Sequence, residues 1–174
     1  MREYVVTCCS TADMSRTFME TNEVPFAMFH YQLDGKEYAD DLYSSISPEV
    51  FYKMIGDGAQ PVTSQVNAEA YCALFEPVLK SGKDVLHLTL SSGISGSINS
   101  ANVAKTQMEE KYPDRRVMVV DSLAASSGYG MLVEQTLENQ RAGMSLEENA
   151  AWIVAHRNTL HHWKIGRASC RERV

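Results

Sequence analysis

Residues 85–90, Val-Leu-His-Leu-Thr-Leu, run directly into residues 91–97, Ser-Ser-Gly-Ile-Ser-Gly-Ser. The apolar first segment predicts a buried parallel strand, and residues 98–104 predict the first turns of a helix. A serine loop at this position puts hydroxyls beside N–H groups that have no helical partner, which predicts an oxyanion site. The alternative is a capped turn without a ligand, because serine is also a favoured N-cap residue.

The composition is that of one medium domain or a fragment of a larger chain. The chain has 174 residues, of which 44% are hydrophobic, and a formal net charge of −6. Nucleic-acid binding needs a basic face, so we expect none. No apolar run could span a bilayer and no signal peptide is visible, so we expect no stable membrane insertion. Cys8, Cys9 and Cys72 form no Cys-x-x-Cys pair, which predicts a reducing, cytoplasmic location.

The last ten residues do not resemble the rest of the chain. Residues 165–174, IGRASCRERV, match the in-frame translation of a common sequencing-adapter DNA. We therefore expect the natural sequence to end near Trp163, with residues 1–163 as one domain and 165–174 as an artefact to be excluded from fold reasoning.

The remaining pattern alternates strands with helices. Strands are predicted at residues 4–8, 24–31, 85–90 and 117–121, and a tight hairpin at Asp34-Gly35. Capping residues predict helices after Ser47, Asn67 and Ser145. Because the strands are apolar on both faces, the fold class is predicted as α/β, a mostly parallel sheet covered by helices on both faces.

Hydroxyl side chains gather where the predicted strands end. Ser10-Thr11 follows the first strand, residues 91–97 follow the third, and Ser122 follows the last, while residues 63–65 could join from an extended loop. Ligands of parallel sheets bind beyond the carboxyl ends of the strands. The hydroxyls are therefore expected to line one crevice.

The motifs of common catalytic sites are missing from this crevice. The nucleophile elbow Gly-x-Ser-x-Gly is broken, because Ser97 stands where its second glycine belongs. No phosphate-binding lysine loop and no dinucleotide loop occurs, and the histidines lack metal-ligand spacing. We therefore expect no metal, no cofactor and an anion that is held rather than converted.

Four motifs in order carry a family resemblance: residues 10–13, 61–65, 90–97 and 120–122. Together they resemble the DegV family of fatty-acid-binding proteins, of the kinase-coupled type, over its N-terminal part. The resemblance implies a two-domain protein that binds the carboxylate of a long-chain fatty acid, with the acyl chain in a tunnel between the domains. It also implies a partner, a fatty acid kinase, to which this non-enzymatic protein presents the acid for phospholipid synthesis. On this resemblance we expect the second domain of the family, which would follow Trp163, to be absent from the given sequence.

The same resemblance implies roles for individual residues. Thr63 and Ser95 would hold the carboxylate, supported by Ser92, Ser64 and the N–H groups of the serine loop. The sequence departs from the family at Cys8-Cys9, where an acid is usual before Ser10, and at Val62, where a second threonine is common.

The rival hypothesis is an enzyme, a phosphosugar isomerase or transferase that holds a phosphate in the serine loop. Such a site needs a carboxylate or histidine within reach, whereas an acyl site needs apolar lining. Phe26, Met28, Ile94 and Ile98 are expected to line the acyl tunnel and favour the lipid. Without a second domain one tunnel wall would face water, so weaker binding and self-association are expected.

Overall fold

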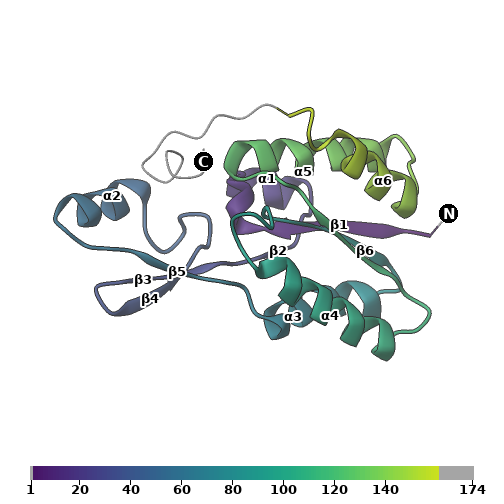
Figure 1. Ribbon diagram of the computed structural model, residues 1–174, viewed down its shortest axis with the longest axis horizontal. Coiled ribbons are helices and arrows are strands. Elements are labelled where there is room, and N and C mark those ends of the chain that lie inside the picture. The colour runs from purple at the N-terminus through teal and green to yellow at the C-terminus, as the bar shows by residue number, and fades with distance from the viewer. Residues whose placement is uncertain (1, 161–174) are drawn as a thin grey trace.

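The computed structural model describes residues 2–160, and a four-stranded parallel sheet lies at its centre (Figure 1). The strand order is β2-β1-β6-β7. The strands are β1 (Tyr4–Cys9), β2 (Phe26–Ala27), β6 (Asp84–Thr89) and β7 (Val117–Asp121). All six residues of β6 are buried, the polar Asp84, His87 and Thr89 included. The predicted α/β class is confirmed, while the prediction about residues 165–174 lies outside the described residues.

Helices cover both faces of this sheet (Figure 1). On one face lie α3 (Ala68–Lys80) and α4 (Ser97–Lys111), and on the other α5 (Ser126–Arg141) and α6 (Leu146–His156). A 3-10 turn, η1 (Ser10–Ala12), and the short α1 (Arg16–Thr21) follow β1. The predicted caps are confirmed: the Asn67 side chain accepts from the Ala70 N–H, and Ser145 forms a capping box with Glu148.

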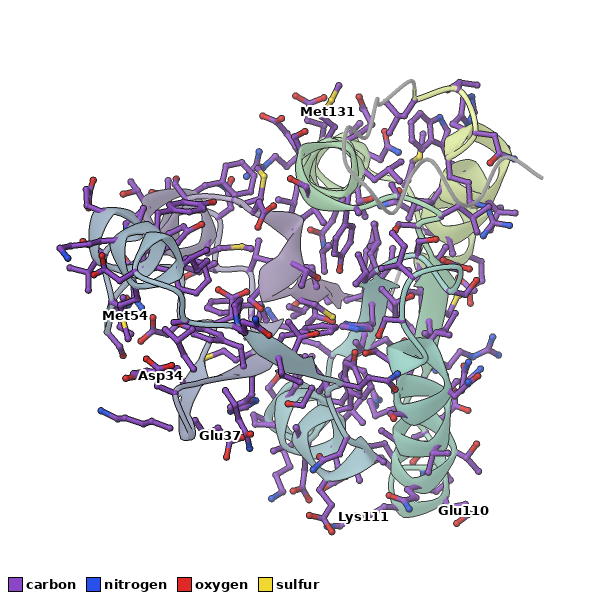
Figure 2. The ribbon with its side chains drawn as sticks, turned by 60° about the vertical axis from the view of Figure 1, so that its left-hand side comes forward. Asp34, Glu37, Met54, Glu110, Lys111 and Met131 are labelled. Atoms are coloured by element: carbon purple, nitrogen blue, oxygen red, sulfur yellow. The ribbon has the colours of Figure 1, made fainter. Side chains whose placement is uncertain are left out.

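A smaller antiparallel sheet with its own helix projects from the side of the molecule (Figure 1). Its strands, in the order β4-β3-β5, are β3 (His30–Leu33), β4 (Lys36–Ala39) and β5 (Val62–Ser64), and the helix is α2 (Pro48–Gly56). The predicted hairpin is confirmed, with φ angles of 52° at Asp34 and 76° at Gly35. We call residues 28–67 the side lobe; Asp34, Glu37 and Met54 lie on its outer side (Figure 2).

The prediction of one strand over residues 24–31 is wrong. The chain forms β2, leaves the parallel sheet at Met28 and starts β3 in the other sheet. Phe29 makes this crossing, because its N–H donates to Ser10 Oγ (3.1 Å) and its carbonyl accepts from the Asp40 N–H (2.7 Å). Its N–H therefore bonds to the turn that follows β1, while its carbonyl bonds to the residue that follows β4 in the smaller sheet.

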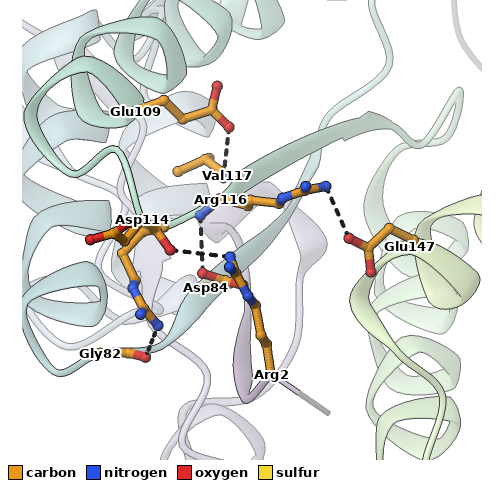
Figure 3. Close-up of polar contacts among 9 residues, drawn as sticks. Arg2, Gly82, Asp84, Glu109, Asp114, Arg116, Val117 and Glu147 are labelled. Atoms are coloured by element: carbon orange, nitrogen blue, oxygen red, sulfur yellow. Dashed lines mark hydrogen bonds and ion pairs between the residues drawn. The ribbon is translucent and has the colours of Figure 1, made fainter.

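Polar contacts join the strands and helices at the amino end of the parallel sheet (Figure 3). Buried Asp84 accepts from the Arg116 N–H (3.0 Å), and Glu109 on α4 accepts from the Val117 N–H (3.0 Å). The Arg116 side chain reaches Glu147 on α6 at 3.2 Å. The serine loop follows the opposite, carboxyl end of β6. These contacts therefore stabilise the fold and do not form part of the site.

Candidate ligand-binding site

The site lies where the strand order of the parallel sheet changes direction. From β1 the chain goes to β2 on one side and later to β6 on the other, so the loops after β1 and β6 diverge. Such a switch point leaves a crevice beyond the carboxyl ends of the strands. Thr11 and Asp13 come from the first loop, and Leu90, Ile94 and Ser95 from the second.

Hydrogen bonds within the serine loop use most of its N–H groups. Those of Ile94 and Ser95 donate to the Ser91 carbonyl (2.9 and 3.1 Å), and that of Gly93 donates to Ser91 Oγ (3.2 Å). The Ser97 N–H donates to Ser95 Oγ at 3.2 Å. The expected support from loop N–H groups is therefore wrong for these four residues, since their donors are already bonded. The loop offers a ligand its hydroxyls instead.

Asp121, at the end of β7, anchors the serine loop. Its Oδ1 atom accepts from the Ser92 N–H (3.1 Å) and the Leu123 N–H (3.0 Å). One carboxylate thus ties the loop after β6 to the loop after β7. The sequence contained Asp121 in a motif but gave no sign of this positioning role.

The segment after β5 approaches the serine loop from the side lobe. A Cβ atom added at Gly96 would lie 3.0 Å from Gln65 Oε1, so the glycine permits close contact between the two segments. Within β5, Ser64 Oγ donates weakly to the His30 carbonyl (3.4 Å). Thr63 and Ser64 are therefore held in a strand, where the sequence suggested an extended loop.

A cavity of about 540 Å³ lies between the side lobe and the parallel sheet. This size is typical of small-molecule sites. It is lined by Thr11, Asp13, Phe29, His30, Tyr31, Ala39, Asp40, Asp41, Tyr43, Ile46, Phe51, Pro61, Thr63, Ser64, Gln65, Leu90, Ile94 and Ser95. Hydroxyls of the parallel-sheet part (Thr11, Ser95) and of the side lobe (Thr63, Ser64) thus line the same cavity as a set of aromatic rings. We call these rings the aromatic wall: Phe29, Tyr31, Tyr43 and Phe51.

The residues singled out from the sequence divide into two groups. Thr63, Ser64, Ser95 and Ile94 line this cavity. Four others do not: Ser92, Phe26, Met28 and Ile98. Ser92 and Met28 are exposed, while Phe26 and Ile98 are half-buried. Their roles in binding a ligand stay predictions.

Three acids also line the cavity, and the sequence reasoning missed them. Asp13, Asp40 and Asp41 come from turns, which are common places for aspartate and so gave no functional signal. Burial raises the pKa of Asp40, and the charge of Asp13 acts in the same direction, although a hydrogen bond from Ser10 opposes both. Asp41 faces its own loop, where its Oδ1 accepts from the Ser44 N–H (2.9 Å).

Beneath the serine loop lies a set of fully buried polar side chains: Thr7, Cys9, Tyr71, His87 and Tyr129. Burial raises the pKa of the Cys9 thiol and lowers the pKa of His87 to about 3. The imidazole is therefore neutral over the physiological range.

Two further features bear on function. Within residues 2–160, no three side chains of His, Cys, Asp or Glu are placed to hold a metal ion together. None of the helices in the described part of the chain has the length and apolar character to cross a membrane.

Comparison with known proteins gives consistent matches. The model of a family described as "Uncharacterised protein, DegV family" matches residues 5–165. A DegV domain-containing protein of Clostridium perfringens is 32% identical over 163 residues, which are 94% of this chain and 56% of the relative. The chain spans about half the length of the curated relatives it matches.

Solved structures show the same architecture. A DegV family protein of Thermus thermophilus, described by its fatty acid binding, is 31% identical with a TM-score of 0.79, over 91% of this chain and 54% of that one. The fatty acid kinase B3 protein of Streptococcus pneumoniae, loaded with linoleic acid, is 22% identical with a TM-score of 0.74, over 90% and 54%. At that identity the second likeness concerns the fold alone.

Proposed function

Because the chain belongs to the DegV family, we propose that it binds a long-chain fatty acid through its carboxylate. The observation that carries the proposal is the cavity, where the hydroxyls of Thr63 and Ser95 meet the apolar surface of Phe29, Ile46 and Phe51. Thr63, Ser95 and Ser64 contact the head group in this proposal, and Ile94 contacts the acyl chain. Ser92 supports the carboxylate in this proposal, and Phe26, Met28 and Ile98 extend the apolar path.

The energetics favour a binding role for such a cavity. Burying about 14 methylenes at ~0.8 kcal/mol each contributes roughly 11 kcal/mol before the costs of association. A hydrogen bond to a charged carboxylate adds only about 1.5–3 kcal/mol. The acyl chain therefore supplies most of the affinity, and the hydroxyls fix its orientation.

We further propose that the protein presents its fatty acid to a fatty acid kinase and is not itself an enzyme. Support comes from the resemblance to the kinase-coupled members of the family and from the lack of nucleotide-binding loops in the sequence. A reducing, cytoplasmic setting suits the thiols of Cys8 and Cys9, which are free and buried.

A second candidate function, a sugar-phosphate enzyme, is favoured by one observation. His30 and the aspartates Asp13 and Asp40 line the cavity, and such residues can act as general acids and bases. Against it, the same cavity carries the apolar surface of Phe29, Ile46 and Phe51, which matches an acyl chain and not a polar sugar.

Native mass spectrometry of the purified chain, followed by lipid extraction, tests the proposal. We expect a long-chain fatty acid to co-purify, and added palmitate to displace it. Failure to bind any fatty acid, together with displacement of the bound species by a sugar phosphate, would support the enzyme instead.

A further inference from the structure

The two central strands of the parallel sheet, β1 and β6, stop pairing with each other before either strand ends. Their register ends where Thr7 lies opposite His87. Strand β1 nevertheless continues to Cys9, where it pairs with β2, and β6 continues to Thr89, where it pairs with β7. The carboxyl ends of these neighbouring strands therefore belong to one sheet but are not paired with each other.

The register identifies the hydrogen bond that is missing between them. In a parallel ladder, every second residue of a strand bonds to the same neighbouring strand. The Glu3 carbonyl accepts from the Asp84 N–H (2.9 Å), so the odd-numbered residues of β1 bond toward β6. Cys9 belongs to this series, and in a continuous ladder its N–H would donate to the Leu88 carbonyl.

The hydroxyl of Tyr129 occupies the position of this bond. It accepts from the Cys9 N–H (2.9 Å) and donates to the Leu88 carbonyl. The phenol thus bridges the two backbone groups that would otherwise bond to each other. All three residues are fully buried, so water does not compete for these groups. Burial also raises the pKa of Tyr129, so the phenol keeps the proton that it donates.

Helix α5 holds Tyr129 against the sheet. Tyr129 lies in the first turn of α5, and the next residue, Gly130, packs against the turn after β1. A Cβ atom at Gly130 would lie only 2.6 Å from the Ala12 carbonyl oxygen, so the glycine permits this close approach. The close packing of α5 fixes how far the Tyr129 ring reaches into the sheet.

The separated strand ends lead directly into the cavity. Thr11 comes two residues after Cys9 and lines the cavity. Leu90 comes two residues after Leu88 and lines it as well. A direct ladder bond would hold the Cys9 nitrogen about 2.9 Å from the Leu88 oxygen. The inserted Tyr129 hydroxyl therefore keeps the two loops farther apart than a continuous ladder would.

We propose that Tyr129 is a positioning residue that holds the carboxyl ends of β1 and β6 apart and so keeps the crevice wide enough for the head group of the ligand. The effect on affinity rests on the proposed function, because it takes a fatty-acid carboxylate as that head group, whereas the separation of the strands does not. Tyr129 does not line the cavity; it acts through the loops that carry Thr11 and Ser95.

Couplings across hydrogen bonds, measured by NMR on the isotope-labelled full chain, test the separation of the strands without any ligand. In the wild type we expect no coupling between the Cys9 amide nitrogen and the Leu88 carbonyl carbon. In Tyr129→Phe these two buried groups lose their partner, and bonding to each other avoids the cost of leaving both unpaired. The coupling should therefore appear in the variant. A direct coupling in the wild type overturns the proposal, even if Tyr129→Phe fails to fold.

Palmitate affinity, measured by titration calorimetry, tests the effect on the cavity. Tyr129→Phe should bind palmitate about tenfold more weakly, because a narrower crevice displaces the carboxylate from a hydroxyl partner. Tyr4→Phe is the matched control, since it also removes a buried hydroxyl, which donates to the Met144 carbonyl (3.1 Å) at the amino end of β1. The control should lose stability and keep its affinity.

The outcomes separate this inference from the proposed function. Wild-type affinity in folded Tyr129→Phe overturns the positioning role and leaves fatty-acid binding intact. Weaker binding without the new coupling between Cys9 and Leu88 also overturns it, because the strands have not closed. If the wild-type chain binds no palmitate, the proposed function fails, and the coupling alone decides whether Tyr129 separates the strands.

Discussion

Thr63 in β5 lies directly opposite Tyr31 in β3, and both side chains line the cavity. The Tyr31 ring contacts Phe51 edge-on, with centroids 5.4 Å apart, so one antiparallel pair joins a hydroxyl to the aromatic wall. A shift of one residue in this register would turn Thr63 away from the cavity. The pairing of β3 with β5 therefore controls the composition of the site.

Ser95→Ala should weaken the binding of free palmitate by roughly tenfold to a hundredfold, the effect of a lost hydrogen bond to a charged group. Binding of the methyl ester should change little, because the ester carries no charge. Titration calorimetry or fluorescence displacement measures both affinities. Ser127→Ala is the matched control, since the Ser127 side chain is exposed and does not line the cavity. Equal losses for acid and ester would contradict the head-group assignment.

Gly130→Ala should destabilise the protein by about 1–3 kcal/mol, as overpacking does. A Cβ atom there would lie 2.6 Å from the Ala12 carbonyl oxygen and 2.5 Å from Met14 Sδ. Urea denaturation measures the loss. Gly56→Ala is the control, because its Cβ meets no atom within 4 Å. A wild-type midpoint for Gly130→Ala would show that α5 can move away from the turn after β1.

The protein should lose stability in acid because of His87. Its pKa is lowered from 6.5 to about 3 by burial, so the unfolded state binds the proton first as the pH falls. Between these two values the stability should fall by ~1.4 kcal/mol per pH unit for this one group. Denaturation at a series of pH values measures the slope, and His87→Gln should lack this contribution. An identical acid dependence in that variant would argue against a buried neutral imidazole.

Asp40→Asn should stabilise the protein at neutral pH more than in acid. Burial raises the pKa of Asp40 above its ordinary value of 3.8, so the folded state disfavours the ionised form. The resulting penalty is absent below pH 3.8 and grows as the pH rises through the folded-state pKa. Thermal unfolding of both proteins at paired pH values measures the difference. Asp34→Asn, on the exposed hairpin turn, is the control.

The chain alone should not phosphorylate a fatty acid. With ATP and palmitate but no added kinase, mass spectrometry should detect no acyl phosphate and no loss of palmitate. Product formation by the purified chain, in proportion to its concentration, would contradict the proposal that it is a binding protein.

The strands and helices around the serine loop were predictable because local sequence alone specifies them. The largely apolar run over residues 85–90, the cap at Asn67 and the hairpin at Asp34-Gly35 each have one favoured conformation. The break at Met28-Phe29 was not predictable, because it depends on hydrogen bonds from Phe29 to Ser10 and Asp40. Neither residue is a sequence neighbour of Phe29, so no local pattern reports these bonds.

The site was predictable only in part, for the same reason. Ser95 and Thr63 stand in distinctive motifs and line the cavity. Asp40 and Phe51 line it as well, but they share a cavity with Ser95 only when the side lobe packs beside the serine loop. Sequence patterns report the faces of single elements, and this cavity is formed between two sheets that share no strand.

The side lobe has a consequence for how the family could diversify. Residues 28–67 form one uninterrupted insertion between β2 and α3, and they carry the aromatic wall of the cavity. Ser95 and the serine loop that carries it belong to the parallel-sheet unit instead. In the proposed function, acyl-chain preference and the head-group contact at Ser95 are thus encoded in separable stretches of the gene. Exchange of the insertion alone would then change which acyl chains are accepted while the serine loop stays the same.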